Sequence, residues 1–386
     1  MRVLLTGTEH AGGLAALRAL KAAGYDPLAA TTSDRDFGAR SRAAAGVVEA
    51  PDAREDPEGF AATIAEAAAE ASVRAVLPGS DGALLALAAH ADRFPAEIAL
   101  GVCPPTTTVV ATDKVATLTY AAEAGVNVLS ARVLGADGPP DASDVRFPVV
   151  VKPMRSVAPA EGQTRRYHTR RADDAEALIV ALAGMPNGVG IVQAYVEGRV
   201  LNVNGVARDG EVIAAVHEEA LRTWPADCGP VSYAQTIAPE AQLAEQARAL
   251  IAALEWSGIF NLQFIEAEAG LFLVDVNPRL YTSIGLAVAA GANLPAIWVE
   301  SLLGGRPEVA PYRVGVRFRS EADVRSLTHL FRSGARGAAL AGLLPQRHTT
   351  HAIASISDPR PGLSYLRRLP GRLMSTGGVL TRAPGL

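Results

Sequence analysis

Lysine is almost absent from this chain of 386 residues. Only three of its 36 basic residues are lysines, at Lys21, Lys114 and Lys152, and the rest are arginines. At a position that needs only a solvated cation, arginine would serve equally well. A lysine within a patterned segment, as Lys114 and Lys152 are, therefore indicates a chemical role.

Cysteine, long apolar runs and a dominant charge are also scarce or missing. Cys103 and Cys228 lie far apart and outside any C-x-x-C pair, which argues against a disulfide framework or a cysteine zinc site. No run of 18 apolar residues occurs, and residues 1–13 hold too short an apolar run for a signal peptide, so we expect no membrane insertion. The net charge is −4 with no long run of one sign, which excludes a typical nucleic-acid-binding surface. These features fit a cytoplasmic protein.

The composition is that of a folded protein that is large enough to contain a cleft. The chain is 49% hydrophobic and 20% charged, and its mean hydropathy is +0.17. Such a chain is too apolar and too weakly charged to be disordered. At roughly 100 to 200 residues per domain, its length predicts two or three domains.

The N-terminal segment alternates strand and helix patterns. Residues 2–6 form an apolar strand, a glycine-rich turn follows at residues 7–13, and residues 14–23 have a helical pattern. Further strands are predicted at 27–30, 46–50, 75–78 and 98–101, with a helix at 59–71. This alternation predicts a small parallel sheet. The turn is not G-x-G-x-x-G, so we interpret it as a tight connection rather than a dinucleotide site, and His10 as a surface residue.

Further elements follow a boundary at residues 103–108, where paired prolines interrupt helix and sheet patterns. A helix with Asp113 and Lys114 in its first turns is predicted to end at Gly125. Later elements are predicted as strands at 201–207 and 211–217, a helix at 239–254, strands at 261–266 and 271–276, and helices at 285–291 and 322–331.

The strongest chemical signal is the strand pair NLQFIEAEAGLFLVDVNPRL. Asp275 and Asn277 are two residues apart and therefore share one face of a strand, and Gln263 lies on the preceding strand of a hairpin. Carboxylate and amide oxygens suit Mg²⁺ when substrate phosphates complete its coordination. Arg279 follows Asn277 by two residues on the same side of the strand, and it is predicted to bind a phosphate.

The two lysines strengthen this interpretation. Lys152 ends an apolar run, VVVK, where a charge is costly unless the strand opens onto a cleft that holds an anion. Phosphate oxygens are a suitable partner. Lys114 lies near the start of a helix, where simple solvation is an alternative explanation.

Together these segments resemble the ATP-grasp superfamily over roughly residues 1–305. TDKVATLTYAAEAGVNV resembles its first lysine helix, FPVVVKP its second lysine strand, VQAYVEG its adenine hinge, and QFIE with LVDVNPRL its metal-binding strands. The resemblance implies an α/β and α+β fold, with an N-terminal Rossmann-like pre-ATP-grasp domain and a two-lobed ATP-grasp fold. We accordingly divide the chain into that domain at 1–104, a small lobe with its linker helix at 105–190, a large lobe at 191–305 and a C-terminal extension at 306–386.

The resemblance also implies roles for individual residues. Lys114 and Lys152 would contact nucleotide phosphates, Arg279 would face the transferred phosphoryl group, and Arg222 would hold a substrate carboxylate or an acyl phosphate. The implied adenine hinge is the backbone of Gln193, Ala194, Tyr195 and Val196. The implied metal ligands, for Mg²⁺ or Mn²⁺ bound with ATP, are Gln263, Asp275 and Asn277.

Three features depart from the family pattern. Asp275 stands where glutamate is usual, and it is one methylene shorter. The segment after Lys152 lacks the common glycine-rich flap, and Arg199 begins the stretch in which an acidic ribose contact is expected. The shorter side chain of Asp275 is expected to shift or loosen the metal site.

Three functions are compatible with this pattern. The leading hypothesis is an ATP-dependent carboxylate-amine ligase that forms an amide through an acyl phosphate, with an amino acid or peptide among its substrates. The alternatives are carboxyphosphate chemistry with bicarbonate, and a nucleotide-binding module that has lost catalysis. A homodimer through the N-terminal domain would fit any of them.

Overall fold

The computed structural model describes residues 1–135, 142–154, 157–160, 163–166, 169–344 and 346–375. The N-terminal domain contains a parallel sheet with the order β3-β2-β1-β4-β5. Its strands are β1 (Arg2–Leu5), β2 (Asp26–Thr31), β3 (Gly46–Glu49), β4 (Ala75–Leu77) and β5 (Ala99–Leu100). Its helices are α1 (Ala11–Ala22), α2 (Phe37–Arg40), α3 (Pro57–Glu70), α4 (Asp81–Ala89) and the short 3₁₀ turn η1 (Ala91–Arg93). The predicted Rossmann-like sheet is confirmed.

This sheet is buried on both faces because its strands are almost entirely apolar. Leu4 and Val76 pack with Phe60 and Ile64 of α3 on one face. On the other face, β1 packs on α1 and on residues of the later chain, including Trp298. The N-terminal domain and the large lobe therefore share one apolar core.

Two helices link the N-terminal domain to the rest: α5 (Pro105–Thr112) and α6 (Lys114–Glu123). The paired prolines stand where α5 begins: Pro104 is its N-cap residue, and Pro105 occupies its first turn, where no backbone N–H is needed. Asp113 caps α6 by accepting hydrogen bonds from the N–H groups of Val115 and Ala116. The cap fixes Lys114 at the first position of the helix.

The small lobe is an antiparallel sheet with the order β10-β7-β11-β6. Its strands are β6 (Ala131–Leu134), β7 (Val149–Lys152), β10 (Arg170–Ala172) and β11 (Gly190–Ala194), and the strands β8 (Val157–Ala160) and β9 (Gln163–Arg166) form a separate hairpin. Helix α7 (Ala175–Ala183) and the 3₁₀ turn η2 (Pro186–Gly188) complete it. Val149 and Val151 pack under α7, which leaves the alternate side chains of β7, including Lys152, on the opposite face.

The large lobe contains a sheet with the order β16-β15-β12-β13-β14-β17-β18. Its strands are β12 (Arg199–Arg208), β13 (Glu211–Thr223), β14 (Val231–Thr236), β15 (Gly258–Ala267), β16 (Gly270–Asn277), β17 (Arg317–Arg319) and β18 (Thr349–His351). Helices α8 (Ala241–Ala253), α9 (Ile284–Ala290) and α10 (Leu294–Leu302) belong to the same part of the chain. Asp209 and Gly210 both have positive φ, at 52° and 78°, as a tight β12–β13 turn requires.

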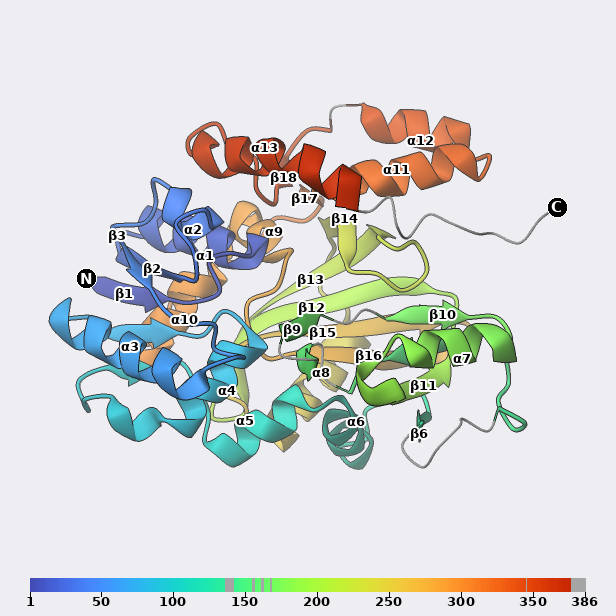
Figure 1. The fold of residues 1–386 in the computed structure, drawn as a ribbon, viewed down its shortest axis with the longest axis horizontal. Coiled ribbons are helices and arrows are strands. Elements are labelled where there is room, and N and C mark those ends of the chain that lie inside the picture. The colour runs from blue at the N-terminus through green and yellow to red at the C-terminus, as the bar shows by residue number, and fades with distance from the viewer. Residues whose placement is uncertain (136–141, 155–156, 161–162, 167–168, 345, 376–386) are drawn as a thin grey trace.

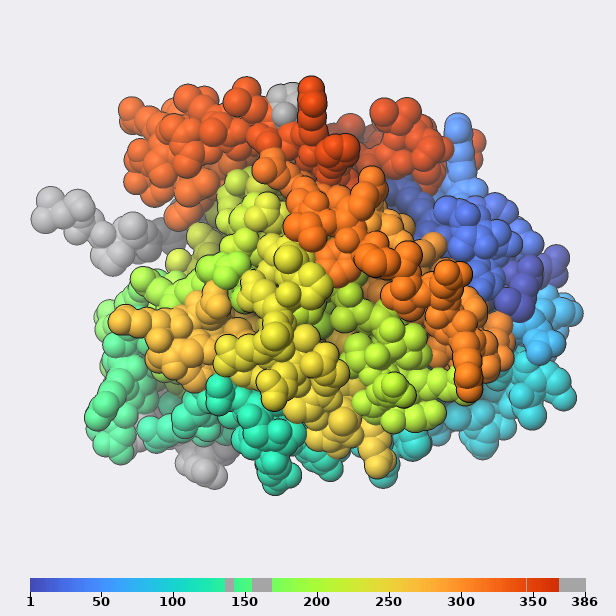
Figure 2. Space-filling model, turned by 180° about the vertical axis from the view of Figure 1, so that it is seen from behind, coloured from blue at the N-terminus to red at the C-terminus, as the bar shows by residue number. Residues whose placement is uncertain are grey.

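The described residues beyond 305 extend the large sheet rather than forming a separate one. They add β17 and β18 to the edge of the large sheet and continue into α11 (Asp323–Arg332), α12 (Arg336–Leu343) and α13 (Pro359–Ser375). Arg18 of α1 donates to Asp358 at 2.9 Å, which ties the extension to the N-terminal domain. Figures 1 and 2 show this orange and red segment lying along one side of the molecule, over both the blue N-terminal domain and the large sheet.

Within the described residues, no single helix is both long and apolar enough to cross a membrane. Helices α9 and α10 meet the length and composition criteria only as a pair, and they are bent by 94° at their junction.

Candidate active site

Four neighbouring strands of the large sheet place polar side chains on one face, in two rows that run across the strands. The first row consists of Glu218, Asn202, Gln263 and Asp275, from β13, β12, β15 and β16. The second row, two residues away along each strand, contains Asn204, Asn261 and Asn277. Residues two apart on a strand share a face. The predicted metal ligands Gln263, Asp275 and Asn277 therefore lie together on β15 and β16, the two strands at one edge of the sheet.

Both predicted phosphate-binding lysines reach this part of the sheet. Lys114, at the start of α6, forms an ion pair with Oδ1 of Asp275. Lys152, at the end of β7, donates from Nζ to the backbone carbonyl of Val274 at 2.7 Å. A small cavity is lined by both lysines, Asp275 and Gln193. The linker helix, the small lobe and the large lobe thus converge on one carboxylate.

The charges in this cluster shift one another's ionisation. Burial lowers the pKa of Lys152 to about 8, although Asp275 opposes that shift. Burial alone would raise the pKa of Asp275, but Lys114 and Lys152 outweigh it and the pKa of Asp275 falls below its ordinary value. Asp275 is therefore an anion at neutral pH. Two ammonium groups face this single carboxylate, so the cavity attracts a further anion.

The predicted adenine hinge begins at the end of β11. The side-chain amide of Gln193 donates to the carbonyl of Leu129 at 3.0 Å, and its buried oxygen Oε1 has no hydrogen-bond partner among the described residues. Ala194 is exposed, and the N–H of Tyr195 donates to the carbonyl of Pro148 at 3.0 Å. A buried acceptor without a partner is unusual in a native protein. The contact of residues 193–196 with adenine stays a prediction.

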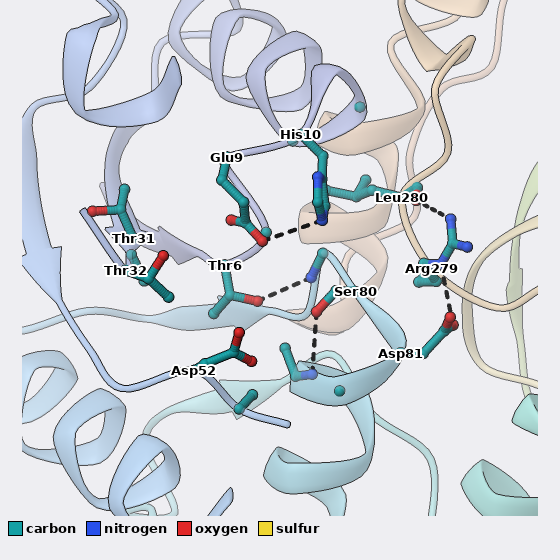
Figure 3. A pocket seen from close by; sticks show the side chains of 18 of the residues that line it. Thr6, Glu9, His10, Thr31, Thr32, Asp52, Ser80, Asp81, Arg279 and Leu280 are labelled. Carbon is teal, nitrogen blue, oxygen red and sulfur yellow. Dashed lines mark hydrogen bonds and ion pairs between the residues drawn. The ribbon is translucent and has the colours of Figure 1, made fainter. Parts of the chain in front are cut away.

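Arg279 connects the polar rows to the N-terminal domain. Its Nη2 donates to Oδ1 of Asn277 at 3.1 Å, and its Nε donates to Oδ1 of Asp81, at the start of α4, also at 3.1 Å. Figure 3 shows the guanidinium between Leu280 and Asp81 at the edge of a pocket. Arg279 therefore stands between the predicted metal ligands and that pocket.

The pocket lies at the carboxyl edge of the parallel sheet and has a volume of about 260 Å³. The loops after β1, β2, β3 and β4 line it, together with residues 279–282 of the large lobe. In open parallel sheets, ligands bind where neighbouring strands send their connections in opposite directions, as β1 and β4 do here. The first turn of α1 packs closely against the large lobe, since a Cβ at Gly12 would lie 2.4 Å from the carbonyl oxygen of Tyr281.

Charged side chains of both signs line this pocket. Arg54 donates from Nε to Oδ1 of Asp52 at 2.8 Å, and Oε1 of Glu9 lies 3.3 Å from Nε2 of His10. Burial raises the pKa of Glu9 to about 7. His10, expected at the surface, is half exposed and also lines the pocket. Figure 3 shows Glu9 and Asp52 on facing walls.

Arg222 contacts a different part of the molecule. Its guanidinium donates to both carboxylate oxygens of Asp323, at 2.7 and 2.8 Å, and lies 4.1 Å from the centre of the Tyr233 ring. Asp323 is buried and begins α11 of the C-terminal extension. Among the contacts of the described residues, Arg222 joins this extension rather than the lysine cluster. Its contact with substrate stays a prediction.

The first polar row includes a buried carboxylate, Glu218, that was not predicted from the sequence. Glu218 is fully buried and accepts hydrogen bonds from Asn202 at 3.0 Å, Asn204 at 2.7 Å and Ser283 at 2.9 Å. Burial raises its pKa to about 7, against the effect of these three donors. The available signal was the pair of asparagines, Asn202 and Asn204, in the otherwise apolar strand VLNVNGVA.

The buried acid predicts a pH-dependent stability difference between wild type and Glu218→Gln. The pKa of Glu218 is about 7 in the folded protein against 4.5 ordinarily, so its contribution to stability is complete below pH 4.5 and is lost as the pH rises to 7. Wild type should lose about 3 kcal/mol relative to Glu218→Gln over this interval. Urea unfolding of both proteins at pH 4.5 and pH 8 measures this change. A difference that is equal at both pH values would contradict it.

The donor groups fit a hard divalent cation that is shared with phosphates. Among the described residues, no three or more His, Cys, Asp or Glu side chains gather as a metal site. The candidate set instead has one ionised carboxylate, Asp275, and two amides, Gln263 and Asn277. Mg²⁺ is typically held by one or two carboxylates while substrate phosphates and water supply the other oxygens.

Known proteins resemble this one in fold over most of the chain and in sequence over a part of it. Residues 189–328 match the family described as "ATP-grasp in the biosynthetic pathway with Ter operon". The carbamoyl phosphate synthase large chain of Clostridium beijerinckii is 25% identical over 187 residues, which is 47% of this chain and 17% of that protein. The matched segment is thus a small part of this curated relative.

Two solved structures share the fold of most of the chain. An L-amino acid ligase from Bacillus licheniformis has a TM-score of 0.60 at 15% identity, and the match covers 78% of this chain and 74% of that one. The biotin carboxylase domain of a 2-oxoglutarate carboxylase from Hydrogenobacter thermophilus, solved with MgADP, ADP and bicarbonate, has a TM-score of 0.58 at 16% identity and covers 82% and 73%. The predicted fold class is confirmed. The predicted resemblance to the ATP-grasp superfamily is confirmed for the sequence of residues 189–328, and most of the chain shares its fold with an L-amino acid ligase and a biotin carboxylase domain.

Proposed function

We propose that this protein is an ATP-dependent carboxylate-amine ligase, which joins a small acid to a small amine and releases ADP and phosphate. The observation that supports it most is the convergence of Lys114, Lys152 and Asp275, from three separate parts of the fold, beside Arg279. This arrangement gathers positive charge and hard oxygen ligands at one place. Phosphoryl transfer depends mainly on such positioning and charge neutralisation.

The proposed reaction has two steps. A carboxylate oxygen of the acid attacks the γ-phosphorus of ATP, and the bond to the β,γ-bridging oxygen breaks, which gives ADP and an acyl phosphate. The ammonium group of the amine then loses one proton to solvent, and its free nitrogen attacks the acyl carbon. The bond between that carbon and the phosphate oxygen breaks, and the nitrogen loses a second proton to solvent. No nucleophilic side chain is required.

Each residue of the cluster has a proposed part in this reaction. Lys114 and Lys152 neutralise the nucleotide phosphates, residues 193–196 hold the base, and Arg279 faces the transferred phosphoryl group. A Mg²⁺ or Mn²⁺ ion, held by Gln263, Asp275 and Asn277, supplies further positive charge to the phosphate oxygens.

The pocket at the edge of the N-terminal sheet is the proposed site of the amine. It opens beside Arg279, and Glu9 places a partly buried carboxylate there. An amine substrate binds as an ammonium ion and would favour the ionised form of Glu9, which burial disfavours. Glu9 would thereby select amines and orient them toward the acyl phosphate.

Oxygen transfer tests the proposed chemistry. With the acid labelled by ¹⁸O in its carboxylate, one labelled oxygen should appear in the released phosphate for each amide formed, because the acyl phosphate breaks between carbon and oxygen. Mass spectrometry of the phosphate measures this. Unlabelled phosphate with normal amide formation would contradict an acyl phosphate.

Replacing Glu9 with Gln should raise the KM for the amine about tenfold or more, because an ammonium ion loses its charged partner. The KM for ATP should change less than twofold, since Glu9 lies in the N-terminal pocket rather than among the lysines. Glu58→Gln is the matched control, because Glu58 is an exposed acid of the same domain that pairs with Arg93. Equal effects of the two substitutions on the KM for the amine would remove Glu9 from the site.

A second candidate is carboxyphosphate chemistry, in which bicarbonate takes the place of the acid. Its support is the likeness to a carbamoyl phosphate synthase and to a biotin carboxylase domain solved with bicarbonate. Gln263 also stands where the carbamoyl-phosphate synthetase branch has glutamine. Stimulation of ADP release by bicarbonate alone would favour this candidate over ligation.

A further inference from the structure

We propose that Asn204 and Asn261 are positioning residues that determine which atoms of Gln263 and Asn277 face the metal, through a chain of amide hydrogen bonds anchored on Glu218. This inference rests on the proposed metal-nucleotide site. It gives a role to Asn204 and Asn261, which lie outside the residues that the family motifs indicate. It also gives a reason for an unpaired acid in the interior of the large sheet.

The series of hydrogen bonds starts at Glu218, whose ionised carboxylate accepts hydrogen bonds and cannot donate them. A carboxylate accepts hydrogen bonds with both oxygens, so an amide beside it must present its nitrogen. Nδ2 of Asn204 donates to Oε2 of Glu218 at 2.7 Å. The oxygen of Asn204 is then directed to the other side, where it accepts from Nδ2 of Asn261 at 2.6 Å.

Each amide that donates with its nitrogen accepts with its oxygen, and this alternation fixes the orientation of the predicted metal ligands as well. The nitrogen of Asn261 is used, so its oxygen accepts from Nδ2 of Asn277 at 2.9 Å and from Nε2 of Gln263 at 3.4 Å. The carbonyl oxygens of these two amides are thereby kept for the cleft, and Oδ1 of Asn277 already accepts from Arg279. Hard cations bind amide oxygens and not amide nitrogens, so a reversed chain would present the wrong atoms.

Burial makes this orientation persistent. Asn204, Asn261 and Glu218 are exposed by 1%, 2% and 0%, so water does not offer their amides an alternative partner. An isolated buried carboxylate is costly, and here neutral donors stabilise it. Glu218 therefore supplies a hydrogen-bond acceptor in the interior, which an apolar residue at position 218 would not.

The test compares two donors to the same oxygen of Glu218. Asn204 and Ser283 both donate to Oε2 and are both buried, but only Asn204 continues to Asn261. Asn204→Leu removes one donor and keeps the number and branching of the side-chain heavy atoms, and Ser283→Ala removes one donor by deleting a single hydroxyl. The measurements are Mn²⁺ binding in the presence of ADP, ADP binding without metal, and urea unfolding.

Asn204→Leu is expected to weaken Mn²⁺ binding tenfold or more, with ADP binding in the absence of metal unchanged within twofold. Ser283→Ala is expected to bind Mn²⁺ within twofold of wild type. Should Asn204→Leu fail to fold, Asn204→Ser removes the same link with a smaller side chain. Mn²⁺ binding unchanged by the Asn204 substitution, equal losses in both variants, or no Mn²⁺ binding by wild type would overturn the inference.

This test separates the inference from the proposed ligase activity, because it needs neither the acid nor the amine. If Mn²⁺ binding follows the expected order while no acid and amine pair stimulates ADP release, the ligase proposal fails and the positioning role stands. If an amide is formed but the two variants bind Mn²⁺ equally well, the positioning role fails alone.

Discussion

Replacing Lys152 with Met is expected to lower ATP-dependent turnover by at least a factor of about 100 while the protein stays folded. Lys152 extends from the small lobe to β16, where Nζ donates to the carbonyl of Val274 beside Asp275. Removing one preorganised group that stabilises transition-state charge typically costs about 10² to 10³ in kcat. Lys152 is a proposed contact to the phosphates of ATP, so the loss should appear in kcat as well as in the KM for ATP.

The same substitution should have a small effect on stability. Burial already disfavours the charge of Lys152 and lowers its pKa to about 8, so an apolar side chain of similar length is tolerated there. The carbonyl of Val274 loses one donor, which costs about 1 kcal/mol. Thermal unfolding should therefore shift by only a few degrees.

Lys21, the one lysine of the sequence that lies outside the candidate site, provides a matched control. Lys21 is half exposed and pairs with Asp26 on the surface of the N-terminal domain, at 3.0 Å. Lys21→Met should leave kcat and the KM for ATP within about twofold of wild type, as is usual for an exposed ion pair. Full activity in Lys152→Met, or an equal loss in Lys21→Met, would remove Lys152 from the mechanism.

Replacing Asp275 with Asn is expected to weaken Mn²⁺ binding in the presence of nucleotide by at least a factor of about 100. Asp275 is the only carboxylate in the candidate ligand set, and a hard cation loses most of its electrostatic attraction when that charge is removed. Lys114 and Lys152 would then face one another without an intervening anion. Equilibrium titration with Mn²⁺ measures the loss.

Two further substitutions show whether the effect is specific. Asp26→Asn removes the same kind of lysine-paired carboxylate at the surface and should leave Mn²⁺ binding within twofold. Asp275→Glu restores the residue that is usual in the family and should retain Mn²⁺ binding. If Asp275→Asn binds Mn²⁺ as tightly as wild type, the metal is held elsewhere.

The sequence allowed the local parts of this site to be predicted because local patterns encode them. Asp275 and Asn277 are two apart on one strand, and Lys152 is a charge at the end of an apolar run. Asp113 and Lys114 follow the cap rule at a helix start. Each of these signals fits within a few residues.

The contacts that complete the site join distant parts of the chain and were not predictable in this way. Asn204 and Asn261 are 57 positions apart, and Arg279 and Asp81 are 198 apart. Their pairing depends on strand order and register, which a single sequence does not specify. Strands β17 and β18 were missed for a related reason, since three residues are too few to show alternation.

The proposed ligase couples ATP cleavage to the joining of an acid and an amine. The most direct test is ADP release with Mg²⁺ and ATP across pooled amino acids, dipeptides, polyamines and bicarbonate, with Lys152→Met as the blank. We expect ADP release above the blank only when an acid and an amine are both present, together with an amide product. Release with bicarbonate as the only added substrate, or ATP binding with no release above the blank in any pool, would contradict it.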